Sequence, residues 1–228
     1  MKKVFITGIT KGIGRAIALA MLKVGYEVSG CARRSTAYEA FQQKNPACKL
    51  YDVDLTDSVS RQKICEILKN LPTFDILINN AGTFVAGPFS QESSNVFWQQ
   101  WQLNVIAPYE LTRAVVPAMI AQKQGTIVNI GSVAAKKILP NCVGYTTTKF
   151  ALDGFTQSLR EELRPHQIRV MSIFPAATLT DSWGEISFPK EQILSPDDIA
   201  QILISALALP HAAVVEEIQI RSIWGDLP

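Results

Sequence analysis

The chain has 228 residues, of which 47% are apolar, and its formal net charge is +2. This composition excludes a disordered chain and predicts a sizeable buried core, and the near balance of charge excludes a general basic field for nucleic acid or membrane. The four cysteines are scattered and the two histidines are far apart, so we expect free thiols in a reducing compartment and no metal site. No apolar run reaches membrane-spanning length and the start lacks a signal-peptide core, so we expect a cytoplasmic protein.

The chain starts with a strand, a glycine-rich turn and a helix. A short apolar strand is predicted at 3–7, a helix with apolar residues at helical spacing at 13–24, and a second strand at 27–32. In this context, Gly8 permits a tight turn, Gly12 lets the backbone approach a pyrophosphate, and Gly14 allows close helix–strand packing. We therefore predict a dinucleotide site whose turn is formed by Gly8, Thr10, Lys11, Gly12, Ile13 and Gly14.

The same alternation of strand and helix continues to the end of the chain. Helices are predicted at 57–70, 93–122, 144–163 and 196–209, and strands at 48–53, 75–79, 125–130, 168–174 and 216–221. This order predicts an α/β fold with a doubly wound parallel sheet covered by helices on both faces. We see no linker or repeat, so one domain is expected. The large rings of Trp98 and Trp101 could lie on an interface or in the core, and core burial is the default expectation.

The residue about twenty positions after the glycine turn selects the nucleotide. An acid there binds the ribose 2′-hydroxyl of NAD, whereas an arginine accommodates the 2′-phosphate of NADP. Here the second strand ends in Arg33 and Arg34, and Lys11 adds a positive charge in the turn itself. We predict NADP(H) in preference to NAD(H).

Tyr145 and Lys149 lie one helical turn apart on the same face of a predicted helix. An ammonium beside a phenol favours the phenolate and lowers the pKa of the phenol. The hydroxyl of Ser132, thirteen residues upstream of Tyr145, could hold a substrate oxygen there. Alone, this pair is more typical of a solvated lysine stem packed on a ring.

Taken together, the motifs resemble those of the classical short-chain dehydrogenases/reductases. The glycine turn, Asn79-Asn80-Ala81-Gly82, Asn104, Ser132 and Tyr145-x-x-x-Lys149 follow one another in the order and spacing of that family. The resemblance runs from the first strand to about Thr180. It implies a single-domain Rossmann-type sheet of about seven strands in the order 3-2-1-4-5-6-7.

The resemblance also implies a reaction, in which hydride passes between NADP(H) and a small carbonyl or alcohol substrate. Tyr145 would act as general acid in reduction and as general base in oxidation. Lys149 would lower the pKa of Tyr145 and bind the nicotinamide ribose. Ser132 would orient the substrate oxygen, and Asn104 would hold a water for a proton relay to Lys149.

Further cofactor contacts are implied by the resemblance around the carboxyl ends of the strands. Asp54 matches the acid that receives the adenine amino group, although it could instead be a helix cap or a surface acid. Asn80, Ala81, Gly82, Tyr145, Lys149, Pro175, Thr178 and Thr180 complete the implied cofactor site. Ala176 departs from the family's usual glycine, and the short segment between Thr180 and Ser195 predicts a fairly open pocket.

Two other functions stay open on the sequence. One is reduction of a 3-oxoacyl thioester on an acidic carrier protein, for which Lys136 and Lys137 could offer a basic patch. The other is an NADPH-binding regulator without turnover, although Ser132, Tyr145 and Lys149 are all present. The resemblance further implies a homodimer or homotetramer formed through the long helices that flank the strand before Ser132. We expect neither nucleic-acid nor membrane partners.

Overall fold

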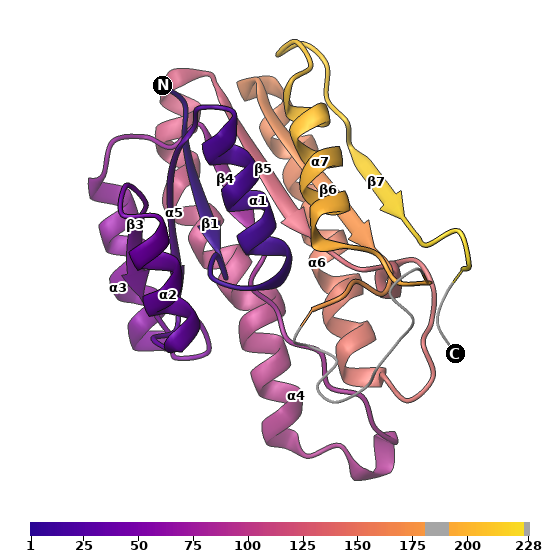
Figure 1. Cartoon of the computed structure of the whole chain (residues 1–228). Coiled ribbons are helices and arrows are strands. Elements are labelled where there is room, and N and C mark those ends of the chain that lie inside the picture. The colour runs from indigo at the N-terminus through magenta and orange to yellow at the C-terminus, as the bar shows by residue number, and fades with distance from the viewer. Residues whose placement is uncertain (181–191, 226–228) are drawn as a thin grey trace.

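The computed structural model describes residues 1–180 and 192–225. Its centre is a seven-stranded parallel sheet in the order β3-β2-β1-β4-β5-β6-β7, which confirms the predicted order (Figure 1). The strands are β1 Lys3–Thr7, β2 Glu27–Ala32, β3 Lys49–Asp52, β4 Ile76–Asn79, β5 Gly125–Ile130, β6 Ile168–Pro175 and β7 Glu217–Ile220. The strands β1 to β3 extend the sheet in one direction and β4 to β7 extend it in the other, so the strand order reverses between β1 and β4. In such sheets, ligands bind at this switch point, outside the carboxyl ends of the strands.

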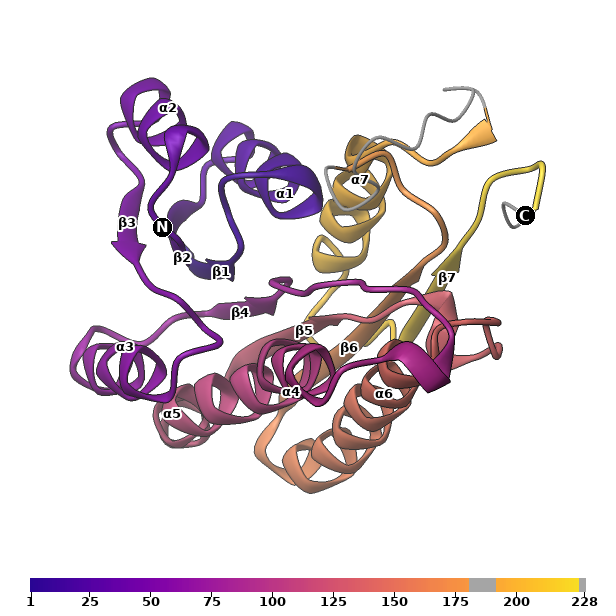
Figure 2. The same ribbon diagram turned by 90° about the horizontal axis from the view of Figure 1, so that it is seen from below.

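Helices cover both faces of the sheet (Figure 2). One face carries α1 Gly12–Lys23, α2 Thr36–Lys44 and α7 Pro196–Leu207. The other face carries α3 Ser58–Asn70, α4 Ser94–Trp101, α5 Ala107–Gln122 and α6 Val143–Leu163. Short 3-10 turns occupy Phe89–Gln91, Val133–Ala135 and Arg164–His166.

Each face of the sheet has its own apolar core, because side chains alternate along a strand. Val4 and Ile6 of β1 join the core under α1 and α7, whereas Phe5 between them joins the core under α3 and α5. Cys31, Cys48, Cys65 and Cys142 are buried free thiols, as predicted.

Two elements differ from the sequence-based expectation. Helix α2 was not predicted, although Ser35 accepts a hydrogen bond from the backbone N–H of Tyr38 (3.3 Å) and so caps it, and Tyr38 and Phe41 face the core. The helix predicted at 93–122 is interrupted by a π-helical turn, Gln102–Ile106, which carries Asn104 with 1% exposure. Such turns often mark functional sites.

The prediction that Trp98 is buried is wrong. Trp98 is 55% exposed, because α4 packs through its other side and leaves this ring on the surface. Trp101 is half-buried and stacks on Phe97 with a centroid distance of 6.0 Å.

Candidate active site

A cavity of about 980 Å³ opens beyond the carboxyl ends of β1, β2 and β4. This is the volume of a large small-molecule site and lies at the switch point of the sheet. Most of the predicted cofactor residues line it, namely Gly8, Thr10, Lys11, Gly12, Ile13, Arg33, Arg34, Asp54, Asn80, Ala81, Gly82 and Thr180. Its lining also includes Cys31, Ser35, Phe84 and Gln99, which the sequence analysis missed. Ser35 could have been found as the cap of the helix that follows the two arginines, but no local signal points to the other three.

The glycine turn requires glycine at the predicted positions. Gly8 and Gly12 have φ values of +68° and +50°, which side chains rarely tolerate. A Cβ on Gly14 would fall on the carbonyl oxygen of Gly8 and the amide of Asn80, so helix and strand pack as closely as predicted. Helix α1 has no side-chain cap at its N-terminus. Its backbone N–H groups are therefore suited to a phosphate, and the turn fits a dinucleotide.

Asn80 braces this turn from β4. Its side-chain amide donates to the carbonyl oxygens of Thr7 (2.9 Å) and Gly8 (3.4 Å), and its own backbone N–H donates to the Thr7 hydroxyl (2.9 Å). Ala81 donates to the same hydroxyl at 2.9 Å. The turn is thus held in place by the residues that follow β4.

The two arginines differ in their surroundings. Arg34 forms an ion pair with Glu39 (Nε–Oε1 2.7 Å), whereas Arg33 is exposed and makes no ion pair with any described residue. Ser35 then begins α2, whose N-terminus adds a positive dipole end to the same wall. Arg33 is therefore the guanidinium most available to a phosphate in the cavity.

Asp54 stabilises the turn in which it lies and also lines the cavity. Its Oδ1 atom accepts hydrogen bonds from the backbone N–H (2.8 Å) and the hydroxyl (2.7 Å) of Thr56. In the described chain its other oxygen receives no hydrogen bond, so it can still accept one from a ligand amine.

Ser132 and Tyr145 meet at the end of β5. Ser132 begins the 3-10 turn Val133–Ala135, is 9% exposed, and hydrogen-bonds to the phenol of Tyr145. Burial raises the pKa of Tyr145 to about 12, and the hydrogen bond from Ser132 partly opposes this effect. The phenol is therefore a proton donor over the whole ordinary pH range.

Lys149 lies below the Tyr145 ring, with Nζ 5.7 Å from the ring centroid. It is 6% exposed and donates to the carbonyl oxygen of Ile130 (3.2 Å), and burial lowers its pKa to about 8. Burial is the dominant influence on the pKa of Tyr145, and the Lys149 ammonium donates to the end of β5. A lowering of this pKa by Lys149 stays a prediction.

The Asn104 amide makes three hydrogen bonds. It donates to the Thr83 carbonyl (3.0 Å) and the Thr148 hydroxyl (3.0 Å), and it accepts from the Thr83 N–H (2.9 Å). Gly82 lies between Asn104 and Lys149, since a Cβ there would stand 3.2 Å from Asn104 Oδ1 and 3.7 Å from Lys149 Nζ. Asn104 thus ties the loop after β4 to the helix that carries Tyr145 and Lys149.

The turn after β6 accommodates Ala176 without a left-handed backbone. The N–H of Ala176 donates to Ile220 (2.9 Å), and its carbonyl accepts from the Thr178 hydroxyl (2.9 Å). The other predicted cofactor residues do not line the cavity, namely Gly14, Tyr145, Lys149, Pro175 and Thr178. Most of the segment expected to leave the pocket open, 181–191, lies outside the described residues.

Two other kinds of feature are absent from the described residues. Within residues 1–180 and 192–225, no three His, Cys, Asp or Glu side chains gather in a way that could hold a metal ion. In the same residues, no helix is long and apolar enough to cross a membrane.

Comparison with known proteins places this arrangement in a family. A family model described as short chain dehydrogenase matches residues 2–190. The chain belongs to the short-chain dehydrogenase/reductase family. It is therefore an oxidoreductase that acts on carbonyl or alcohol substrates with a nicotinamide cofactor.

Individual members of the family show how far the similarity extends. L-xylulose reductase of Mesocricetus auratus is 29% identical over 218 residues, covering 95% of this chain and 85% of the relative. An alcohol dehydrogenase from Thermococcus sibiricus, solved with 5-hydroxy-NADP, is 25% identical with a TM-score of 0.89 and covers 100% of this chain and 99% of its own. A 4-hydroxyisoleucine dehydrogenase solved with NADH is 26% identical with a TM-score of 0.89, covering 98% of each chain. Structures of this fold thus hold cofactors with or without the 2′-phosphate.

Proposed function

We propose that the enzyme reduces a small ketone with NADPH and that Tyr145 is its general acid. The observation that carries this proposal is the cluster of Ser132, Tyr145 and Lys149 beside a crevice whose far wall presents Arg33. A bound nicotinamide supplies the hydride in such a reaction. Ser132 orients the substrate oxygen, and Tyr145 gives it a proton.

Lys149 and Asn104 have supporting roles in this proposal. A lysine whose pKa is about 8 holds and releases a proton near neutral pH, so Lys149 is suited to binding the ribose and to restoring the proton on Tyr145. Because both N–H groups of the Asn104 amide are engaged by Thr83 and Thr148, we propose that its side chain holds the loop after β4 in place, while Oδ1 can still accept a hydrogen bond from a water of the proton relay.

The pocket favours a compact substrate. The Phe84 ring packs edge-on against Tyr145 at a centroid distance of 4.8 Å and walls one side of the phenol. The hamster relative is named for a sugar ketone, L-xylulose, which is small and polar. We therefore propose a small hydroxylated ketone as the substrate class.

Carrier-bound thioesters are the weaker candidate. Lys136 is not available to an acidic carrier protein, because its ammonium pairs with Asp153 (2.9 Å) and Glu217 (3.0 Å) and its side chain is only 22% exposed. The proposed basic pair therefore loses at least one of its two charges. A regulator without turnover would often have lost a catalytic residue, whereas Ser132, Tyr145 and Lys149 are all present here.

The first prediction concerns a substrate panel. NADPH oxidation at 340 nm, measured with hydroxyketones, diketones and a 3-oxoacyl thioester, should be fastest with the small hydroxyketones. A preference for the thioester would overturn the substrate class, and the absence of turnover with every carbonyl would favour the regulator. The same panel with NADH as the reductant tests the cofactor.

The second prediction concerns cofactor choice. Arg33→Gln should weaken NADPH binding about 10- to 100-fold, because charge-assisted hydrogen bonds to the 2′-phosphate are lost, and should leave NADH binding within about threefold. Dissociation constants from cofactor fluorescence would measure both. Arg113→Gln, an exposed arginine on α5, is the matched control. Equal losses for the two cofactors would show that Arg33 does not read the 2′-phosphate.

The third prediction concerns assembly. We propose a single domain that forms a homodimer or homotetramer through α5 and α6, because Tyr109 (46% exposed) and Phe150 (44%) leave aromatic surface on these helices, where Tyr109 also packs on Phe155. Light scattering during gel filtration should give at least twice the monomer mass, and Phe150→Arg should lower it. A monomeric wild type contradicts this proposal.

A further inference from the structure

The short turn that begins at Ser132 ends at Lys136. The backbone N–H of Lys136 donates to the carbonyl oxygen of Val133 (2.9 Å), and the backbone N–H of Ala135 donates to that of Ser132 (2.9 Å). These bonds make residues 132–136, which we call the Ser132 turn, a compact unit. A contact that fixes Lys136 therefore also restricts where the Ser132 hydroxyl can lie.

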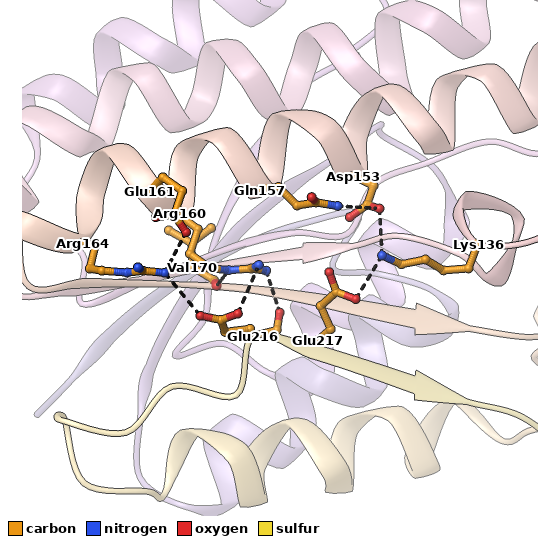
Figure 3. A network of polar contacts seen from close by, with 9 residues as sticks. All are labelled: Lys136, Asp153, Gln157, Arg160, Glu161, Arg164, Val170, Glu216 and Glu217. Carbon is orange, nitrogen blue, oxygen red and sulfur yellow. Dashed lines mark hydrogen bonds and ion pairs between the residues drawn. The ribbon is translucent and has the colours of Figure 1, made fainter.

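The ammonium of Lys136 lies between two carboxylates (Figure 3). Its Nζ atom is 2.9 Å from Asp153 Oδ2 on α6 and 3.0 Å from Glu217 Oε2 on β7. Burial alone would lower the pKa of Lys136, but the hydrogen bonds to the two carboxylates outweigh it and raise this pKa. Lys136 thus stays charged and links the Ser132 turn to two other elements.

Asp153 belongs to the same helix as Tyr145 and Lys149. The three residues follow one another at intervals of four along α6, so they occupy successive turns of one face. Asp153 is 7% exposed, and its Oδ2 atom also accepts a hydrogen bond from the side-chain amide of Gln157 (3.0 Å). The contact with Lys136 therefore attaches the Ser132 turn to the helix that carries the phenol.

Helix α6 is itself fixed to the sheet. Further along the helix, Arg160 donates to the backbone carbonyl oxygens of Val170 in β6 (3.0 Å) and of Glu216 just before β7 (2.8 Å) (Figure 3). Asp153 is thus a fixed point, and Lys136 holds the Ser132 turn against it.

The ring of Phe174 gives the Ser132 turn a second fixed contact. A Cβ on Gly131 would stand 2.8 Å from Phe174 Cδ1, so this ring packs against the backbone just before Ser132. The Lys136 ammonium lies 4.5 Å from the centroid of the same ring, which is a cation–π distance. The turn is therefore held by β6 at its start and by both β6 and α6 at its end.

A buried ion pair of this kind adds little net stability, because the loss of hydration offsets the attraction. What it fixes is geometry, and a displacement of about 1 Å in a reacting group can cost on the order of 10²-fold in rate. We propose that Lys136, through its ion pair with Asp153, is a positioning residue that sets the Ser132 hydroxyl against the Tyr145 phenol. This inference rests on the catalytic roles proposed above for Ser132 and Tyr145.

A double-mutant cycle between Lys136 and Ser132 tests the positioning role, with kcat for NADPH oxidation measured on the best ketone of the substrate panel. Lys136→Met should lower kcat about 10- to 100-fold, because the Ser132 turn is released from α6. In the Ser132→Ala background the same change should lower kcat less than about twofold, since no hydroxyl is left to position. A residue that only stabilises the fold would cause the same loss in both backgrounds.

Two further variants serve as controls for the cycle. Lys136→Arg keeps the charge and should keep kcat within about threefold of wild type. Lys69→Met is the matched control, because Lys69 forms an exposed ion pair with Glu66 (2.6 Å) on α3, and it should change kcat less than about twofold.

Asp153→Asn keeps the test valid even where Lys136→Met unfolds the chain. It retains the shape of the side chain and weakens the same contact from its other partner. It should lower kcat about tenfold when Ser132 is present and less than about twofold in the Ser132→Ala background.

Two results would overturn the positioning role and leave the proposed function intact. One is a kcat within twofold of wild type in both Lys136→Met and Asp153→Asn while Ser132→Ala loses activity. The other is an equal loss from these changes with and without the Ser132 hydroxyl. A wild-type kcat in Ser132→Ala itself would instead contradict the proposed function, and the positioning role of Lys136 would fall with it.

Discussion

Tyr145→Phe should lower turnover at saturating ketone and NADPH by about 10²–10⁴-fold or more. The change removes one oxygen from a ring that otherwise packs as before, edge-on against Phe84 and above Lys149. It therefore removes the proton donor without opening a cavity. The kcat for NADPH oxidation, measured on the best ketone of the substrate panel, gives the effect directly.

A matched control for this variant is Tyr26→Phe, which removes a phenolic oxygen from a half-buried ring just before β2, outside the cavity lining. It should leave kcat within about twofold, as expected of a change away from the site. Turnover by Tyr145→Phe within threefold of wild type would contradict the assignment of the general acid. A loss in Tyr145→Phe that appeared only in KM would instead assign the phenol to substrate binding.

The pH dependence of the two reaction directions follows from the raised pKa of Tyr145. With a pKa of about 12, the phenol stays protonated below pH 10 in the free enzyme. Reduction needs the protonated form, so Tyr145 should cause no loss of reduction rate up to that pH. Oxidation needs the phenolate, so its rate should rise with pH throughout the range.

The sequence predicted the sheet well because its signals are local. A strand buried on both faces has to be a short apolar run, and the turn out of β1 tolerates little besides glycine at Gly8 and Gly14. The order of strands came from the resemblance to a family rather than from such runs, since no local pattern specifies which strand lies beside which.

Other features depend on contacts between distant residues, and the sequence did not reveal them. The pKa of Tyr145 depends on how deeply the crevice buries it and on the direction of the Lys149 ammonium. The hydrogen bonds of Asn104 need a π-helical turn that brings it to Thr83 and Thr148. Helix α2 did have a local signal in the sequence, because Ser35 is a typical helix cap and Tyr38 and Phe41 follow it at helical spacing.

Lys149→Met should abolish turnover and yet make the protein more stable at pH 7. Burial lowers the pKa of Lys149 from 10.5 to about 8, so the folded chain binds this proton more weakly than the unfolded chain does. The difference corresponds to about 3 kcal/mol of destabilisation when the ammonium is held in the fold. Methionine fills the same space without a charge. The loss of the hydrogen bond to Ile130 destabilises the variant by about 1 kcal/mol, which is subtracted from the gain. We expect a net gain of about 1–2 kcal/mol in the free energy of unfolding, measured by urea titration.

The sign of this effect can be checked with pH, because a lowered folded-state pKa makes stability rise where the unfolded state binds more protons. The destabilisation of the fold by the buried Lys149 ammonium is fully present below about pH 8, and it decreases as the pH rises from 8 to 10.5. The gain from Lys149→Met should therefore shrink across this window, whereas exposed Lys63→Met should stay within about 0.5 kcal/mol of wild type throughout. A variant that is less stable than wild type at pH 7 would mean that Lys149 supports the fold. A stable variant without turnover would instead mean that its buried charge is kept for proton transfer beside Tyr145, at a cost to the stability of the fold.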